Sequence, residues 1–457
     1  MNCRKSWTLL LVSVIAVSGC TSYQSHTPGT ASQGPGQPPA ASPTTAKPIA
    51  QPPGSLSCRT YGCVGDGTSD DTVPIRNMIQ DACNEGGETL YLPSGTYRIQ
   101  PQNPGENALT IACSNITLMG AGQTFTTLSS YLEGGGLPNN SCPIISTSTG
   151  SKVWRGSGVV IRGGITADET VHDVTVEDLT LDGHARQTGD STWPSTSADC
   201  FNWDITHKGI LVTADRYVDK ITISNTHITG FLGELIYQGG EWGTNILITG
   251  NEIDTTNADG ISVSAGMSAT DNNIHDIGHA GFEDEIENSS QTISGNSISS
   301  VGVSGIDLVS NEHAGASVGF VVTGNTITNA LVRGIGGIPV QNLSLSNNSF
   351  VDSGQKLAAI YLENPTTAST IVTRNVQISG NSILSQKAPV NAAIIFVSGN
   401  GGPILSPWTV DLSVVNNVME ESVSSGGKIK ATLVHCTYPG SIDQGLTVSG
   451  NYIVETP

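Results

Sequence analysis

One pattern of eight residues recurs along the chain: ILITGNEI at residues 246–253, QTISGNSI at 291–298, FVVTGNTI at 320–327 and VQISGNSI at 376–383. Apolar residues alternate ahead of a small residue and an asparagine, and a further apolar residue follows. Alternation with a period of two indicates a strand with one buried face. The copies recur from residue 174 to the C-terminus with a base spacing of about 22–23 residues, a period typical of a parallel β-solenoid. The sequence therefore predicts an all-β chain of stacked coils that share one core.

The asparagines mark nine copies of the repeat and predict nine or ten coils. Stacked asparagines at a solenoid corner satisfy backbone groups and tolerate left-handed backbone, so we expect a structural role for them. The marker residues are Asn225, Asn251, Asn273, Asn296, Asn325, Asn348, Asn381, Asn417 and Asn451.

The sequence ahead of the repeats predicts a cap. Residues 72–84 have helical spacing, with Ile75, Met78, Ile79 and Ala82 on one face, and Asp71 is placed to cap the helix. Residues 88–99 then alternate as strands. A helix at this position covers the open end of a solenoid, whose edge is otherwise exposed.

The cap also carries a resemblance to a known family. Its matching residues are Tyr61-Gly62, Gly65-Asp66-Gly67, Asp70-Asp71-Thr72, Gly86-Gly87 and Gly95-Thr96-Tyr97. This stretch resembles the start of the pectate-lyase superfamily of right-handed parallel β-helices, in the branch of epimerase-like and rhamnogalacturonase-like domains. The resemblance implies a single right-handed β-helix over residues 57–457 with an N-terminal capping helix. It also implies a carbohydrate-active enzyme, a glycoside hydrolase or a polysaccharide lyase, that works along the outer face of one sheet.

Composition excludes some classes of partner. The chain of 457 residues has a formal net charge of −20 and only 13% charged residues. A nucleic-acid binder needs a basic surface, so that class is excluded. A strongly acidic protein also repels polyanions unless a cation bridges them, which favours a neutral or weakly charged polysaccharide.

The first 20 residues are expected to be a signal peptide. Arg4 and Lys5 precede a short apolar run, and Val17-Ser18-Gly19-Cys20 resembles a bacterial lipobox, in which the cysteine is lipidated. The resemblance implies a lipoprotein of the bacterial cell envelope, held in the membrane through acyl chains on Cys20, and Thr21 favours the outer membrane. The alternative is an ordinary secretory signal. Residues 21–56 are rich in Pro, Ser and Thr and are predicted to be a disordered tether.

Seven cysteines remain after Cys3 and Cys20 are set aside, in an oxidising compartment where disulfides form. Four of the seven cluster near the start of the domain, which favours local disulfides there, although the sequence leaves the pairing open. The four are Cys58, Cys63, Cys83 and Cys113.

A candidate site follows from aligning the strand that comes after each asparagine. If Ile261, Phe282 and Ile306 point inward, the next residue of each strand points outward. The outward column then reads Ser262, Glu283, Asp307, Gly336, Tyr361 and Ile395, and a second column two residues on reads Ser264, Glu285, Val309, Ile338, Glu363 and Val397. Glu283 and Asp307 therefore fall on neighbouring coils. Like charges at that distance separate the two pKa values and provide an acid and a base.

Three interpretations of the acidic run FEDEIE at residues 282–287 stay open: a solvated acidic face, a Ca²⁺ site formed by Glu283, Glu285 and Asp307, and an acid–base pair. Asp284, by alternation, is expected to point inward. The candidate catalytic residues are Glu283, Asp307, Arg333, Tyr361 and Asp259, with Arg333 or Tyr361 as the base if the enzyme is a lyase. His275, His279 and His313 are expected to be surface residues.

Substrate contacts are predicted from two further features. Trp193 and Trp203 lie in a long loop, residues 184–207, and aromatic faces stack on sugar rings. Glu285 and Glu363 flank the outward column. Two hypotheses result: a cell-envelope-anchored enzyme that degrades or modifies a polysaccharide, and a non-catalytic glycan-binding or adhesive β-helix.

Overall fold

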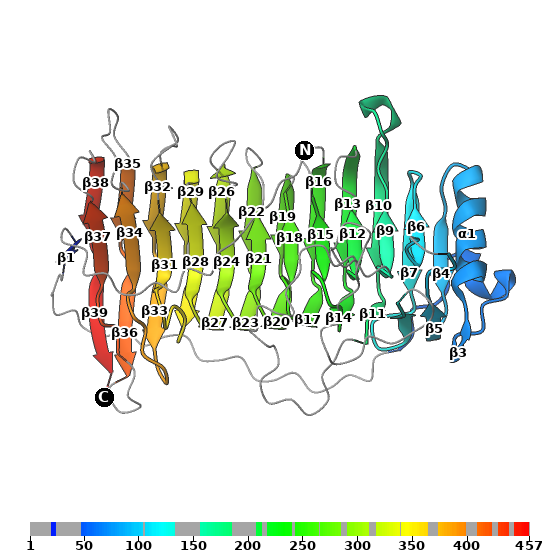
Figure 1. The fold of residues 1–457 in the computed structure, drawn as a ribbon, viewed down its shortest axis with the longest axis horizontal. Helices are drawn as coiled ribbons and strands as arrows, with labels where there is room; N and C mark the ends of the chain where they lie inside the picture. The colour runs from blue at the N-terminus through cyan, green and yellow to red at the C-terminus, as the bar shows by residue number, and fades with distance from the viewer. Residues whose placement is uncertain are drawn as a thin grey trace, which may run out of the picture.

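The protein is a long rod of stacked coils in the computed structural model (Figure 1). The prediction of a single right-handed parallel β-helix is confirmed, because three long parallel sheets run along the rod. The structure describes residues 20–23, 47–103, 106–132, 156–184, 207–212, 217–239, 243–264, 266–284, 290–309, 317–338, 340–363, 373–398, 409–422, 428–437 and 443–456.

Sheet A, which carries the candidate site, has 12 strands. In chain order they are β1 (Cys20–Tyr23), β6 (Leu109–Ile111), β9 (Val159–Ile161), β12 (Ile210–Val212), β15 (Ile236–Gln238), β18 (Ile261–Val263), β21 (Ala280–Asp284), β24 (Ser304–Val309), β28 (Arg333–Ile338), β31 (Ala358–Glu363), β34 (Ile394–Ser398) and β37 (Leu433–Thr437).

Sheet B has 14 strands. They are β2 (Leu56–Ser57), β4 (Thr89–Leu92), β7 (Ile116–Gly120), β10 (Val171–Glu177), β13 (Val218–Ser224), β16 (Gly243–Thr249), β19 (Met267–Thr270), β22 (Gln291–Ser294), β25 (Ser317–Val318), β26 (Phe320–Thr323), β29 (Val340–Ser346), β32 (Thr373–Ser379), β35 (Thr409–Val415) and β38 (Asp443–Ser449).

Sheet C has 13 strands. They are β3 (Asp66–Asp70), β5 (Gly95–Ile99), β8 (Thr126–Ser130), β11 (Thr180–Asp182), β14 (His227–Thr229), β17 (Glu252–Thr256), β20 (Asn273–Ile277), β23 (Ser297–Val301), β27 (Thr326–Ala330), β30 (Ser349–Val351), β33 (Ser382–Ser385), β36 (Val418–Ser422) and β39 (Tyr452–Thr456).

Each coil runs through sheets B, C and A in that order, as β16, β17 and β18 do before β19 begins the next coil. The stack is longer than the nine or ten coils predicted, because the first coils lack the marker asparagine. The interior is a continuous stack of aliphatic and aromatic side chains. On sheet A this column is fully buried and consists of Ile210, Ile236, Ile261, Phe282, Ile306, Ile335, Ile360 and Ile394.

A buried asparagine ladder joins the coils between sheets B and C. Asn272 is typical: its backbone N–H and its Nδ2 both donate to Oδ1 of Asn296, at 3.0 Å and 2.9 Å, and Nδ2 also donates to the carbonyl of Ile248. The predicted structural role of the asparagines is therefore confirmed. Two of the nine markers were wrong by one residue, since Thr226 and Asn272 occupy the ladder positions assigned to Asn225 and Asn273.

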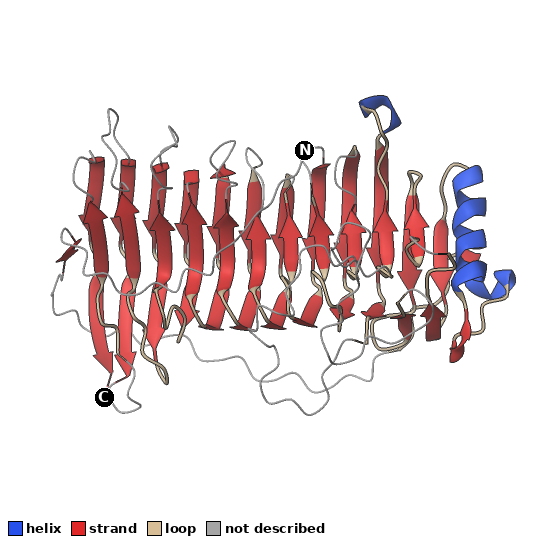
Figure 2. Cartoon of the chain, viewed as in Figure 1, coloured by secondary structure: helices blue, strands red, loops and turns tan. Residues whose placement is uncertain are grey.

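The predicted capping helix is α1 (Thr72–Asn84), and it covers one end of the rod (Figure 2). The four residues of its predicted apolar face are buried. Asp71 occupies the N-cap position, as predicted, but its side chain makes no capping hydrogen bond. Its carboxylate accepts from the backbone N–H groups of Val64 and Gly65, at 2.6 Å and 3.0 Å, while Asp70 Oδ1 accepts from the N–H of Thr72.

The cap is also held by local covalent links. Disulfides join Cys58 to Cys63 and Cys83 to Cys113, as expected from the clustering of these four residues. Two short 3₁₀ helices complete the helical content that the structure describes: η1 (Cys58–Tyr61) and η3 (Ala167–Glu169).

Part of the predicted tether contacts the first coils. The N–H of Ile49 donates to the carbonyl of Ala121 at 2.9 Å, and the Tyr91 hydroxyl donates to the carbonyl of Ile49 at 2.5 Å.

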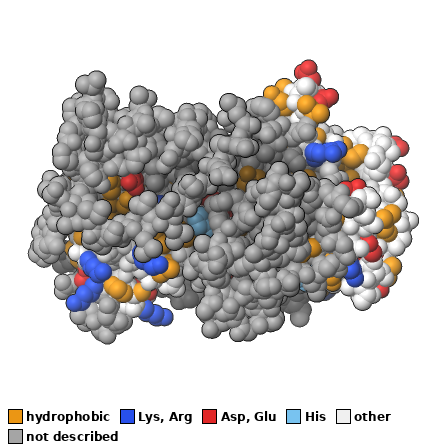
Figure 3. All heavy atoms as spheres, in the orientation of Figure 1, with side chains coloured by type: hydrophobic (Ala, Val, Ile, Leu, Met, Phe, Trp, Pro, Cys, Tyr) orange, Lys and Arg blue, Asp and Glu red, His pale blue; other side chains and the backbone are white. Residues whose placement is uncertain are grey.

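At the other end of the rod, β1 pairs antiparallel with β37, and its backbone places Cys20 opposite Cys436. Among the described residues, no helix is long and apolar enough to cross a membrane. In Figure 3, Lys and Arg side chains gather over the C-terminal coils. Lys387, Lys428 and Lys430, which belong to the last coils, are exposed.

Candidate functional site on sheet A

The outward column on sheet A has the predicted register. Ser262 pairs with Glu283, Glu283 with Asp307, Asp307 with Gly336, and Gly336 with Tyr361. Ser262, Glu283 and Asp307 are all buried, with 0%, 5% and 2% exposure. Buried carboxyl groups are costly without partners, so their surroundings decide what they can do.

Asp307 is held by the next coil. Its Oδ2 accepts from Nη2 of Arg333 at 2.8 Å and from the Ser304 hydroxyl at 3.2 Å, and Nε of Arg333 donates to the same hydroxyl at 3.1 Å. Gly336 leaves room for this arrangement, because a Cβ there would lie 2.9 Å from Arg333 Nη1 and 3.0 Å from Asp307 Oδ1. Arg333 and Asp307 form a largely buried ion pair that fixes one carboxylate of the column.

On the other side of Glu283, Asp259 and His279 form a second pair. Nδ1 of His279 lies 2.7 Å from Asp259 Oδ1, which also accepts from the N–H of Ala280. Burial favours the neutral form of Asp259, but His279, together with Glu283 and the N–H of Ala280, outweighs this effect and lowers the pKa of the carboxyl group. Burial likewise opposes protonation of His279, yet Asp259 raises the pKa of the imidazole. Each group thus stabilises the charged form of the other.

Glu283 lies between these two pairs. The ligand atoms of Asp259, His279 and Glu283 lie within 4.8 Å of one another. Two carboxyl groups this close favour one shared proton between them. On the next coil, Asp307 faces the guanidinium of Arg333 instead.

Asp284 points into the coil, as alternation predicted. It is fully buried, and its Oδ1 accepts from Nε2 of Gln291 at 2.6 Å. This hydrogen bond offsets part of the cost of burying the acid.

Tyr361 and Glu363 form a pair within β31. The Tyr361 hydroxyl donates to Glu363 Oε2 at 2.8 Å, since residues two apart lie on the same face of a strand. Burial raises the pKa of Glu363, and the tyrosine hydrogen bond and the charge of Arg333 oppose that rise in part. The Tyr361 hydroxyl is thus already hydrogen-bonded to Glu363, a residue of its own strand.

The sequence analysis missed the next residues along the same face. Tyr237 pairs with Ser262 and continues the outward column, and Nζ of Lys208 lies 4.1 Å from the centre of its ring. Lys208 also forms a buried ion pair with Glu234. The alignment began at Ile261, although residues 234–239 carry the same strand pattern and could have extended it by one coil. His279, expected only as a surface residue, is 26% exposed and pairs with Asp259. A position at a coil corner does not reveal such a partner on the preceding coil.

Several predicted site residues lie outside the described residues: Trp193, Trp203 and Glu285. The side chain of Cys20 is likewise not described. A Ca²⁺ site at Glu283, Glu285 and Asp307 therefore stays a prediction. The described group that could hold a metal on this face, Asp259, His279 and Glu283, includes a nitrogen donor, whereas Ca²⁺ prefers oxygen ligands.

Comparisons with known proteins agree with the fold. The family described as "Right handed beta helix region" matches residues 208–383. The mannuronan C5-epimerase AlgE3 of Azotobacter vinelandii is 42% identical over 74 residues, which are 16% of this chain and 4% of that protein. Alginate lyase 7 of the same organism is 31% identical over 130 residues, 28% of this chain and 13% of that protein. The chain thus matches a small part of these curated relatives.

A solved structure extends the likeness along the rod. The A-module of mannuronan C-5 epimerase AlgE4 of Azotobacter vinelandii superposes with a TM-score of 0.56 at 18% sequence identity. The superposition covers 88% of this chain and 100% of the module. At this level of identity the likeness concerns the fold.

Proposed function

We propose that this chain, which has the right-handed parallel β-helix fold of the pectate-lyase superfamily, is an enzyme that cleaves glycosidic bonds of a polysaccharide on the outer face of sheet A. One observation carries the proposal: Glu283 and Asp307 are direct partners on neighbouring strands, both are buried, and they have different partners. Because fold alone does not fix function, the proposal depends on this local geometry.

The two carboxyl groups can divide the work of hydrolysis. Glu283 donates its proton to the leaving glycosidic oxygen as the C–O bond breaks, and Asp307 accepts a proton from the water that attacks the sugar carbon. Arg333 and Ser304 hold the Asp307 carboxylate in position. The nearby carboxyl group of Asp259 would help to keep a proton on Glu283, and His279 balances the charge of Asp259.

The second candidate is elimination or epimerisation at a uronate sugar. It is supported by the pair of Tyr237 and Lys208 on the same face, since a phenol beside an ammonium group can act as a proton-transfer residue. The relatives named above act on mannuronan and alginate by their names. Hydrolysis is preferred here, because Glu283 and Asp307 provide a pair of carboxyl groups on neighbouring coils.

A digestion panel tests these alternatives. Purified protein is incubated with alginate, polygalacturonate and neutral exopolysaccharides, with and without Ca²⁺. New reducing ends without absorbance near 235 nm support hydrolysis, and reducing ends with that absorbance support elimination. A change in uronate composition without chain cleavage supports epimerisation. Binding without any of these changes would favour the non-catalytic, adhesive alternative and contradict the proposal.

We also propose that the protein is anchored to the bacterial cell envelope, in the outer membrane, through lipid on Cys20. The lipobox-like sequence that ends at Cys20 supports this. Acyl chains provide membrane attachment without a spanning helix. Metabolic labelling with a palmitate analogue should label the wild-type protein and fail to label Cys20→Ser. Labelling that persists in the variant would contradict the anchor.

A further inference from the structure

We propose that the outer face of sheet C holds one first-row divalent metal ion, of the Zn²⁺ class, between His227, Glu252, Asp254 and His275. The four residues come from three successive coils: His227 from β14, Glu252 and Asp254 from β17, and His275 from β20. The register places His227 beside Glu252 and Asp254 beside His275. This site is separate from the column on sheet A and does not depend on the proposed hydrolysis.

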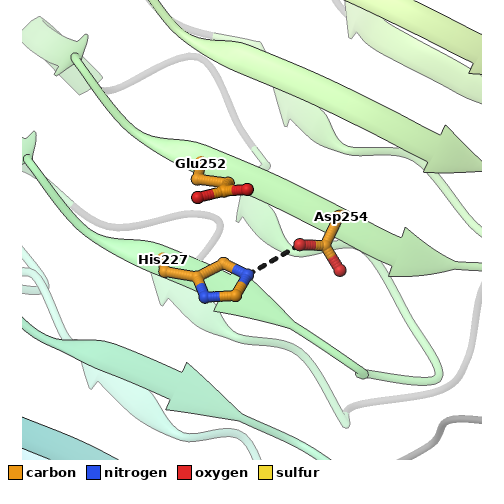
Figure 4. Close-up of side chains that lie close together, drawn as sticks. All are labelled: His227, Glu252 and Asp254. Atoms are coloured by element: carbon orange, nitrogen blue, oxygen red, sulfur yellow. Dashed lines mark hydrogen bonds and ion pairs between the residues drawn. The ribbon is translucent and has the colours of Figure 1, made fainter. Parts of the chain in front are cut away.

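The donor atoms of three of these residues already converge. Figure 4 shows the imidazole of His227 on the same face as the carboxylates of Glu252 and Asp254, directed toward Asp254. His227 Nε2 lies 2.6 Å from Asp254 Oδ2, and ligand atoms of the three residues all lie within 4.8 Å of one another. Nε2 of His275 lies 3.5 Å from Glu252 Oε1, outside the converging group of three, and would complete the site by a rotation of its side chain. Ligands of a tetrahedral Zn²⁺ lie about 2.0–2.2 Å from the ion.

Groups behind the ligands orient them as metal sites require. The hydroxyls of Thr229 and Thr255 both donate to Asp254 Oδ1, each at 2.6 Å, which directs Oδ2 toward His227. Nδ1 of His275 lies 2.9 Å from Asp276 Oδ2, which directs Nε2 toward Glu252. Metal-bound histidines usually contact a carboxylate through the second ring nitrogen, and such contacts fix the ring for coordination.

The backbone conformation of Thr255, next to Asp254, is a further sign of a functional site on this coil. Thr255 has a φ of 64°, a left-handed conformation that is unfavourable for a β-branched residue. The corresponding corners of neighbouring coils are occupied by Gly230, Asp276 and Ser300, which adopt it more easily. The strain places a hydroxyl on Asp254, and strained backbone of this kind concentrates at functional sites.

The donor chemistry selects the kind of ion. Two imidazoles with two carboxylates suit Zn²⁺ and its first-row neighbours, whereas Ca²⁺ and Mg²⁺ prefer oxygen ligands. The side chains of His227 and His275 are about a quarter exposed, at 25% and 26%, and Glu252 is 45% exposed. An ion can therefore reach the site from solvent, and it would cross-link three coils of the rod.

Calorimetric titration of untagged, EDTA-treated and dialysed protein with Zn²⁺ tests the site. Wild type should bind one Zn²⁺ here, and His227→Ala and Asp254→Asn should weaken that binding at least tenfold. Glu252→Gln, at an exposed position that should tolerate the change, provides a third variant with little risk to folding. His172→Ala is the matched control, since His172 and Asp173 form an exposed pair on sheet B with 2.7 Å between Nδ1 and Oδ2.

The second described metal-capable group, on sheet A, needs its own variant. His279→Ala should leave the Zn²⁺ binding of the sheet C site intact. Thermal unfolding should show the same pattern, with Zn²⁺ raising the Tm of wild type and of His172→Ala but not that of His227→Ala. The proposal is overturned if wild type shows no saturable binding, if the three variants at the site bind as wild type does, or if only His279→Ala removes binding.

Discussion

Arg333 on β28 reaches back one coil and donates from Nη2 to Oδ2 of Asp307, 2.8 Å away, across the surface of Gly336. This ion pair differs from the pair of Asp259 and His279 two coils earlier, which lies beside Glu283 instead. Glu283 and Asp307 are direct neighbours, yet Glu283 lies close to a second carboxyl group and Asp307 is paired with a guanidinium. That asymmetry makes the column suitable for acid–base chemistry.

The space over Gly336 should control activity. In Gly336→Ala, the new Cβ displaces the Arg333 side chain and loosens Asp307, so we expect turnover to fall at least tenfold, since misplacing a catalytic group by about 1 Å can cost about 10²-fold. The Tm should change by no more than about 4 °C, because the Arg333 side chain can move. Gly266→Ala is the control, since the nearest atom to its Cβ would be 3.9 Å away. Equal activity of the two variants would contradict the assignment.

The pair of Asp259 and His279 predicts a pH dependence of stability. Because Asp259 raises the pKa of His279, the pair stabilises the fold fully below the unfolded histidine pKa of about 6.5. That contribution is lost as the pH rises through the folded-state pKa. Because the pKa of Asp259 is lowered, its contribution is lost as the pH falls below about 4.

His279→Gln should therefore flatten the decline in the free energy of unfolding on the alkaline side. Urea denaturation at a series of pH values measures this decline for both proteins. Asp307 and Arg333 also act on His279, with opposite signs, so the same series in Asp307→Asn measures the share that comes from Asp307. An unchanged alkaline decline in His279→Gln would show that another group is responsible.

The asparagine ladder predicts a large difference between two asparagines. Asn325 is buried and accepts from both the N–H and Nδ2 of Asn296. Asn325→Ala removes the one oxygen that accepts both bonds, so it should cost about 2–3 kcal/mol of unfolding free energy. Asn273→Ala, at an exposed strand position, should stay within about 0.5 kcal/mol of wild type. Chemical denaturation followed by far-UV circular dichroism compares them, and similar losses would contradict the ladder.

The fold could be predicted because its causes are local and repeated. Alternation fixes which face of each strand is buried, so aligning Ile261, Phe282 and Ile306 was enough to place Glu283 beside Asp307. The helix over residues 72–84 followed from its own spacing. The errors at Asn225 and Asn273 arose where two polar residues adjoin, since only contacts between coils show which of them enters the ladder.

The partners of the site residues could not be predicted in the same way. His279 lies at a coil corner, and its contact with Asp259 depends on how far the corner turns. The Arg333 side chain crosses Gly336 to reach Asp307, a path that alternation does not describe. Lys208 and Tyr237 were missed because the alignment stopped one coil short.

Product release by Glu283→Gln and Asp307→Asn tests the central claim most directly, with the polysaccharide that the digestion panel identifies as substrate. Both variants keep the size of the side chain, and Glu177→Gln on sheet B controls for the loss of an acid elsewhere. We expect turnover to fall by about 10²–10⁴-fold in each of the two variants and to stay unchanged in the control. Wild-type turnover in Glu283→Gln and Asp307→Asn would show that the chemistry takes place elsewhere.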